Sequence, residues 1–256
     1  GITGTTEEQA RLLIPTAMIY EKIMRINQAA HIFFNSTDLC DGIIADYALK
    51  CNRISQSHDF EKDVLSAAKK IAIRYNSNLT HTSYVEKIAL NIFDSMKNIS
   101  GLNKRDRLLL QVAVRLHDCG AYVNFEDVAS NSYKIISSSE IIGLTKQENI
   151  LIASIVGNPV TTFPSYSEIR DDMTEQDYVR VTKLTCIFRI ANDLDTSKKQ
   201  KLTHIKINLK DDTLVITGES FMDFALEQAY FNHSSDLFTQ TFGITPRIKR
   251  RRINNV

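Results

Sequence analysis

The sequence predicts a mainly α-helical protein that ends in a small module of mixed helix and strand. Over residues 60–194, apolar side chains recur every three or four positions, as they do on the buried face of a helix. After Lys201 the period changes to two, because THIKINLK and TLVITG alternate apolar and polar residues on either side of a turn at Asp211 and Asp212. A helical pattern over residues 221–242 and a last stretch, ITPRIKRRR, complete a ββαβ module.

Three segments are expected along the chain. Residues 1–50 show a helix–strand–helix order, with a helix that starts near Glu7, a short apolar strand HIFF at residues 31–34, and a helix after Gly42. A lone strand has no partner for its backbone hydrogen bonds, so we expect this segment to close a domain whose body lies upstream. Residues 51–200 are expected to form a helical bundle, and residues 201–256 the ββαβ module.

Composition limits the classes of function. The 256 residues carry a formal net charge of +1, so no field of one sign covers the molecule, and neither a specific nucleic acid nor a membrane is expected as a partner. No apolar run is long enough to cross a bilayer, and no signal peptide is evident. The four cysteines form no CxxC pattern, which is typical of reduced thiols in a cytoplasmic protein.

A candidate metal site comes from the ends of three predicted helices. The stretch LLLQVAVRLHDCG is expected to form a helix that presents His117 and Asp118 together at its end, where Gly120 should stop it. His81 lies in the first turn of the preceding helix, and Asn192 lies near the end of a later one. Neutral imidazoles and carboxylates bind a divalent ion and leave a position for water, whose pKa the ion lowers.

In this chain order, the histidine, the His-Asp pair and the late cluster ANDLD resemble the HD superfamily of metal-dependent phosphohydrolases. With the segments STDLCDGIIADYA, HTSYVEKIALNIFD, VRLHDCG, RIANDLDTS and KDDTLVITGESFMDFALEQA, the whole chain is similar to the C-terminal half of the exopolyphosphatase/guanosine pentaphosphate phosphohydrolase family. The most specific parts are the LxDGII segment, the ordered histidines, and the RIANDLD element joined to the ββαβ module.

The resemblance implies that binding and catalysis lie in different parts of the protein. Members of the family carry two N-terminal actin-like lobes that hydrolyse terminal phosphoanhydride bonds with Mg²⁺, and an HD-like C-terminal part that contributes to long-chain substrate binding and dimerisation. Residues 1–50 would match only the end of the second actin-like lobe. The catalytic residues are therefore expected outside this chain, which should itself need no cofactor. The expected partners are the upstream lobes, polyphosphate or another polyanion, and a second copy of the chain.

The chain departs from the family pattern at its metal site. Asn192 stands where fuller HD members have an aspartate, and its helical register with Leu184 and Phe188 predicts that it faces the core. Asp193 follows Arg189 by four positions and is expected to face solvent in an ion pair. A carboxamide oxygen can bind a metal but brings no charge to offset it. A histidine that often precedes a serine in the family reads as Asn131 here, and the family's later Val-x-x-His reads as Val156-Gly157-Asn158-Pro159, without the histidine.

Alternatives remain open for each candidate group. One alternative is that His81 is simply a first-turn helix residue and that His117 and Asp118 form a hydrogen-bonded pair that ties two helices. The other is that these three residues, together with Asn192, hold a divalent metal. Cys119 is expected to be a packed thiol rather than a nucleophile. A set of basic residues is expected either to be solvated or to bind a polyanion by charge neutralisation. This set comprises Lys198, Lys199, Lys201, Lys249, Arg250, Arg251 and Arg252.

Two functions follow from these patterns. The preferred one is a C-terminal fragment of an exopolyphosphatase-like phosphatase, non-catalytic alone, that serves polyphosphate binding and dimer assembly. The alternative is a metal-dependent HD-type phosphohydrolase that acts on a nucleotide or a phosphoester.

Overall fold

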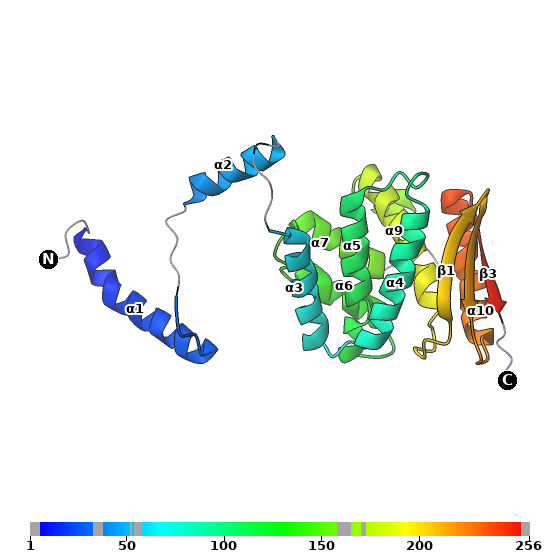
Figure 1. Ribbon diagram of the computed structural model, residues 1–256, viewed down its shortest axis with the longest axis horizontal. Coiled ribbons are helices and arrows are strands. Elements are labelled where there is room, and N and C mark those ends of the chain that lie inside the picture. The colour runs from blue at the N-terminus through cyan, green and yellow to red at the C-terminus, as the bar shows by residue number, and fades with distance from the viewer. Residues whose placement is uncertain are drawn as a thin grey trace. The chain divides into compact units, whose positions relative to one another are not determined.

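The structure, a computed structural model, describes residues 6–32, 38–51, 53, 58–157, 165–169 and 173–251, which fall into two units that divide after His58 (Figure 1). The first unit contains α1 (Glu7–Asn27) and α2 (Leu39–Lys50). Asp38 caps α2 by accepting a hydrogen bond from the N–H of Asp41 (2.9 Å), and the Asp41 carboxylate accepts one in return (3.1 Å). Of the strand predicted at residues 31–34, the first two residues lie in no regular element and the last two lie outside the described residues.

The second unit is mainly helical, as predicted, and four helices pack around α5 (Lys104–Leu116). Side chains on every side of α5 are buried, including Leu109, Leu110 and Val112, which is the pattern of a helix inside a core. Among the described residues, no helix combines the length and the apolar content that a membrane span requires. The other helices are α3 (Phe60–Arg74), α4 (Leu79–Ser95), α6 (Val128–Ser138), α7 (Lys146–Gly157), the short α8 (Tyr166–Ile169) and α9 (Glu175–Asp193).

The sequence predicted that Gly120 ends α5, and this prediction was wrong. The helix ends at Leu116 and is followed by a 3₁₀ turn, η1 (Cys119–Tyr122), that contains the glycine. A Cβ at Gly120 would lie 2.2 Å from the carbonyl oxygen of Val128 and 2.5 Å from the backbone nitrogen of Ser132. Glycine is therefore required here by the close approach of α6, and not by the termination of a helix.

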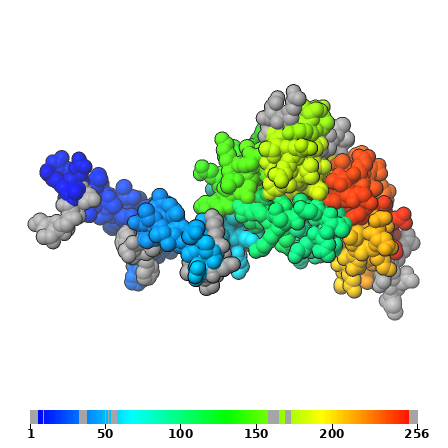
Figure 2. All heavy atoms as spheres, turned by 90° about the horizontal axis from the view of Figure 1, so that it is seen from above, coloured from blue at the N-terminus to red at the C-terminus, as the bar shows by residue number. Residues whose placement is uncertain are grey.

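The C-terminal ββαβ order is confirmed. β1 (Thr203–Lys210) and β2 (Thr213–Glu219) form an antiparallel hairpin, and β3 (Thr245–Arg251) pairs in parallel with β2, so the strand order is β1-β2-β3. The connection from β2 to β3 is α10 (Ala225–Phe242), which packs against α9 and β3. It ends at Gly243, whose left-handed φ of +69° is typical of a helix C-terminus. The sheet and α10 lie together at the end of the second unit opposite α3 (Figures 1 and 2).

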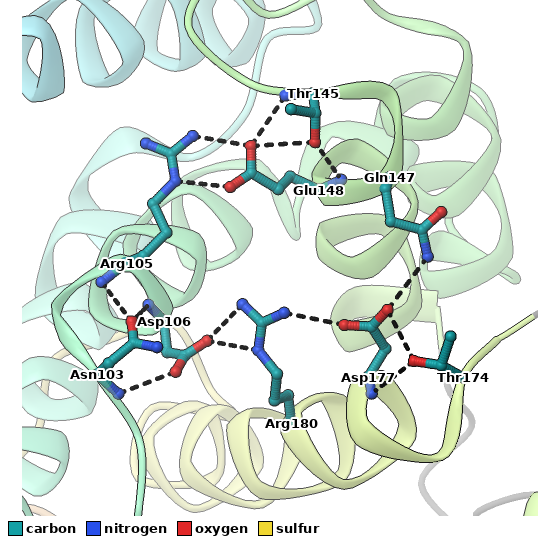
Figure 3. Close-up of polar contacts among 9 residues, drawn as sticks. All are labelled: Asn103, Arg105, Asp106, Thr145, Gln147, Glu148, Thr174, Asp177 and Arg180. Carbon is teal, nitrogen blue, oxygen red and sulfur yellow. Dashed lines mark hydrogen bonds and ion pairs between the residues drawn. The ribbon is translucent and has the colours of Figure 1, made fainter. Parts of the chain in front are cut away.

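A network of ion pairs joins the start of α5 to α7 and α9 (Figure 3). Asp106 is 1% exposed; one of its oxygens accepts hydrogen bonds from Arg180 (2.7 and 2.8 Å), and the other accepts one from the N–H of Asn103 (2.9 Å). Arg105 forms a two-pronged contact with Glu148 on α7 (2.6 and 2.8 Å). Asp106 thus joins α5 to α9, and Arg105 joins α5 to α7; the buried carboxylate is stable only while its partners are in place.

We expect Asp106→Ala to lower the free energy of unfolding by about 3 kcal/mol, because it leaves the half-buried Arg180 with one fewer partner and removes the reciprocal half of the capping box that Asn103 forms at the start of α5. A matched control is Asp94→Ala, which breaks the exposed two-pronged contact with Arg107 and should cost less than about 1 kcal/mol. Urea denaturation of both variants measures the difference. Equal losses would show that the Asp106 network does not anchor α5.

Candidate functional site

Two histidines from neighbouring helices meet in the core of the second unit. His81 lies in the first turn of α4, which is capped by Asn78 rather than Thr80, because the Asn78 side chain accepts the N–H of His81 (3.1 Å). His117 follows α5 directly. The side chains are 2% and 8% exposed, and their Nε2 atoms are 3.1 Å apart. The structure thus brings together the two histidines that the sequence singled out.

The hydrogen bonds of the two rings define their tautomers. His81 Nδ1 lies 2.7 Å from the carboxylate of the fully buried Asp195, which also accepts the backbone N–H (2.6 Å) and the side-chain amide (2.8 Å) of Gln200. Asp195 is therefore an acceptor, and His81 Nδ1 donates to it. His117 Nδ1 lies 2.6 Å from the carbonyl oxygen of Val114, which can only accept, so this nitrogen also carries a proton.

These tautomers impose a condition on the Nε2 contact. Two neutral rings that both donate through Nδ1 would face each other with lone pairs, which repel at 3.1 Å. The contact is stable only with a positive charge between the rings, either a second proton on one of them or a cation bound to both. Burial, and next the electrostatic effect of His81, lower the pKa of His117 to about 4. An imidazolium–imidazole pair with Asp195 as counterion satisfies every hydrogen bond.

Asp118 is engaged away from this pair. One of its oxygens accepts a hydrogen bond from Lys198 Nζ (2.5 Å), and the other accepts one from the backbone N–H of Asn78 (3.0 Å). Burial alone raises the pKa of Asp118, but the hydrogen bonds from Lys198 and Asn78 outweigh it and lower that pKa. The ammonium group of Lys198 also acts electrostatically on His117 and lowers its pKa further. A lysine thus supplies positive charge at the place where the sequence suggested a metal.

The end of α9 differs from the prediction. Asp193 was expected to face solvent, but it is buried, and burial raises the pKa of its carboxyl group to about 6. Asn192 is only half-buried, although its Oδ1 atom is covered and has no hydrogen-bond partner among the described residues. It lies one turn after Phe188, whose ring packs against His117 with centroids 5.2 Å apart. The prediction was wrong because α9 packs against four helices and has no fully exposed side at this end.

The described residues do not match a tightly bound divalent ion. The Nε2 atoms of the two imidazoles face each other, but Asp118 is paired with Lys198 and Asp195 holds His81. Within the described part of the chain, no group of three or more His, Cys, Asp or Glu side chains is placed to hold a metal. The ligand charge that a divalent ion requires is therefore already neutralised by protein cations.

The predicted polyanion-binding residues fall into different environments. Lys198 is paired with Asp118, and Lys201 with the fully buried Glu227 (3.0 Å). Lys199 and Lys249 are exposed, and the half-buried Arg250 approaches the carbonyl oxygen of Met222 (3.5 Å). The side chain of Arg251 and the whole of Arg252 lie outside what the structure describes. Two of the predicted cations are thus already neutralised by carboxylates.

Cysteine reactivity tests whether the site holds a nucleophile. Burial raises the pKa of Cys119 and of Cys186 to about 11, whereas Cys40 and Cys51 are exposed. At about pH 8 we expect iodoacetamide to label the two exposed thiols quickly and the two buried ones only after unfolding, because a nucleophilic thiolate is scarce well below the pKa. Mass spectrometry of the peptides measures the order. Rapid labelling of Cys119 in the folded protein would contradict its assignment as a packed thiol.

Comparison with protein families agrees with the resemblance noted in the sequence. The model of the Ppx/GppA phosphatase family, domain III, matches residues 65–238. The match covers more than half of the chain and includes α4, α5, α9 and the cluster around His81 and His117. The chain therefore belongs to the Ppx/GppA phosphatase family and carries its domain III.

Proposed function

We propose that this chain is a binding and assembly module of an exopolyphosphatase-like phosphatase and does not cleave bonds by itself. The observation that carries the proposal is the state of the histidine cluster. Both rings donate through Nδ1, Asp195 and Asp118 have protein partners, and no carboxylate of the described cluster remains to bind a metal or to accept a proton from water.

The surroundings of the cluster support the same conclusion. A general base must reach the proton that it removes, but the Nε2 atom of His117 faces His81, and the ring is 8% exposed. Cys119 is fully buried and its raised pKa keeps it protonated. We assign hydrolysis to the actin-like lobes of a complete protein, with Mg²⁺ as their metal. The present chain then contributes surface for polyphosphate, for those lobes, and for a second copy in a dimer.

A second candidate is metal-dependent hydrolysis of a nucleotide or phosphoester. Two observations favour it: the Nε2 atoms of His81 and His117 converge on one point, and the covered Oδ1 atom of Asn192 has no hydrogen-bond partner among the described residues. A divalent ion between the rings would supply the positive charge that their contact requires. The engagement of Asp118 by Lys198 makes this candidate the less favoured.

We expect the purified chain to contain no stoichiometric metal and to release no phosphate from polyphosphate or nucleotides, with or without Mn²⁺. Elemental analysis and phosphate release measure this, and His117→Ala serves as the control, with circular dichroism to verify its fold. Stoichiometric metal together with turnover that His117→Ala abolishes would establish the second candidate.

Polyphosphate binding, the second part of the proposal, is tested by a separate measurement. Fluorescently labelled polyphosphate should bind the wild-type chain, and the affinity should fall steeply with salt, because neutralisation of a polyanion by protein cations releases counterions. Absence of binding at low ionic strength would remove polyphosphate from the proposed function while leaving the assembly role to be judged by the oligomeric state.

A further inference from the structure

The three-stranded sheet has one apolar and one polar face. Leu214 and Ile216 of β2 are buried against the helices, whereas their neighbours on β2 point to the opposite face and are half-buried. On the strands at either side, the residues of that opposite face are exposed. We call this polar surface the outer face. It contains Lys206, Asn208 and Lys210 of β1, Thr213, Val215 and Thr217 of β2, and Thr245, Arg247 and Lys249 of β3.

The strand register arranges the outer face as a trough. Lys206 and Lys249 flank Thr217 in one row across the sheet, and Asn208 and Arg247 flank Val215 in the next. The long cationic side chains thus rise from the two edge strands, while the middle strand carries only short ones. A hollow of about 410 Å³ lies over one end of the β1–β2 hairpin, beside Lys206, Asn208 and Thr217 of this surface, and is also lined by His204, Gly218 and Glu219. In Figure 2, the hairpin of β1 and β2 (amber) forms part of the surface of the second unit.

The dimensions suit an extended chain. The two edge strands of a three-stranded sheet lie about 9–10 Å apart, and residues two apart on a strand are separated by about 7 Å. Arg247 and Lys249 therefore line one wall at about that spacing, and Lys206 and Lys210 line the other over about twice that length. The threonine hydroxyl groups of the floor add hydrogen-bond donors between the cations.

The four cations of the trough differ from the cations of the second unit that are used in ion pairs. Lys198, Lys201, Arg105, Arg115 and Arg180 each contact a carboxylate. Within the described part of the chain, Lys206, Lys210, Arg247 and Lys249 form no ion pair. The acidic residues closest in sequence are Glu219 at one end, which is paired with His204 (3.0 Å), and Asp211 and Asp212 in the hairpin turn at the other. The four positive charges of the walls thus lie between the acidic residues at the two ends of the trough.

We propose that the outer face of the sheet binds polyphosphate along β2, with Lys206, Lys210, Arg247 and Lys249 as its walls; this inference rests on the proposed function and locates its binding site. A single-stranded nucleic acid fits less well, because sheets that bind one present aromatic side chains for the bases to stack on, and the outer face carries none. A linear polymer of phosphate needs only evenly spaced cations and hydroxyl groups.

The experiment compares two double variants with the same change in charge. Lys206→Glu/Lys249→Glu reverses the pair that flanks Thr217, whereas Lys70→Glu/Lys134→Glu reverses two exposed lysines on α3 and α6. Binding of labelled polyphosphate to the full chain is followed over a range of salt concentrations. We expect the first variant to bind about ten-fold more weakly or worse, with a shallower dependence on salt, and the control to change by less than about two-fold.

A third variant distinguishes the effect of the trough's shape on binding from the effect of its charge. Thr217→Tyr fills the floor, keeps all four cations, and introduces a residue that strands tolerate well, so it should also weaken binding. Full binding by Thr217→Tyr, or equal losses in the two double variants, would assign binding to diffuse charge and overturn the trough. Equally tight binding of an oligothymidylate would overturn its assignment to polyphosphate. If the wild-type chain fails to bind polyphosphate, the trough and the binding part of the proposed function fail together, whereas retained binding in all variants overturns the trough alone.

Discussion

The contact between His81 and His117 requires a positive charge in the protein core, and the elements around it are arranged to meet that requirement. Asp195 balances the charge from one side, and its remaining hydrogen bonds come from Gln200, so the segment after α9 is fixed against α4. Asp118 and Lys198 form a second neutral pair beside it and bind the same segment to the end of α5. Buried charges persist only when each has a partner, and here the partners come from elements far apart in sequence.

Lysine side chains have different roles in the two parts of the second unit. Lys201 is 11% exposed and its ammonium group is held by a buried carboxylate, so it serves the fold. Lys249 is exposed on a strand and forms no ion pair with the described residues, so its charge remains available to solvent or to an anion. A sequence that is nearly neutral overall can therefore present a locally basic surface, because its positive and negative charges are not evenly distributed over the fold.

Helical periodicity was enough to predict the mainly α fold, and together with the alternation after Lys201 it predicted the ββαβ order. The meeting of His81 with His117 was implied only by the resemblance to the HD superfamily. Periodicity could not show that α9 is covered on nearly all sides, and for that reason it placed Asp193 in solvent. The partners of Lys198 and Lys201 were also hidden, since ion pairs across 80 and 26 positions leave no trace in local spacing. Alternation identified which residues of the hairpin share a face, but only the parallel register of β3 on β2 shows that Lys249 shares this face and Arg250 does not.

A shallow row of exposed cations suits the polyphosphate chain that we propose as its ligand better than a deep pocket would. Each exposed ionic contact contributes only about 0–1 kcal/mol, so no single phosphate is held firmly. Several such contacts on one chain act together, because after the first has formed the others are intramolecular and their effective concentration is high. Because every phosphate of a linear polyanion presents the same charge, the chain can shift by one repeat without losing contacts, as proteins slide on DNA. A phosphatase that shortens such a chain from its end must keep the remainder bound and still allow it to move forward. Weak, repeated ionic contacts that salt partly screens would meet both conditions.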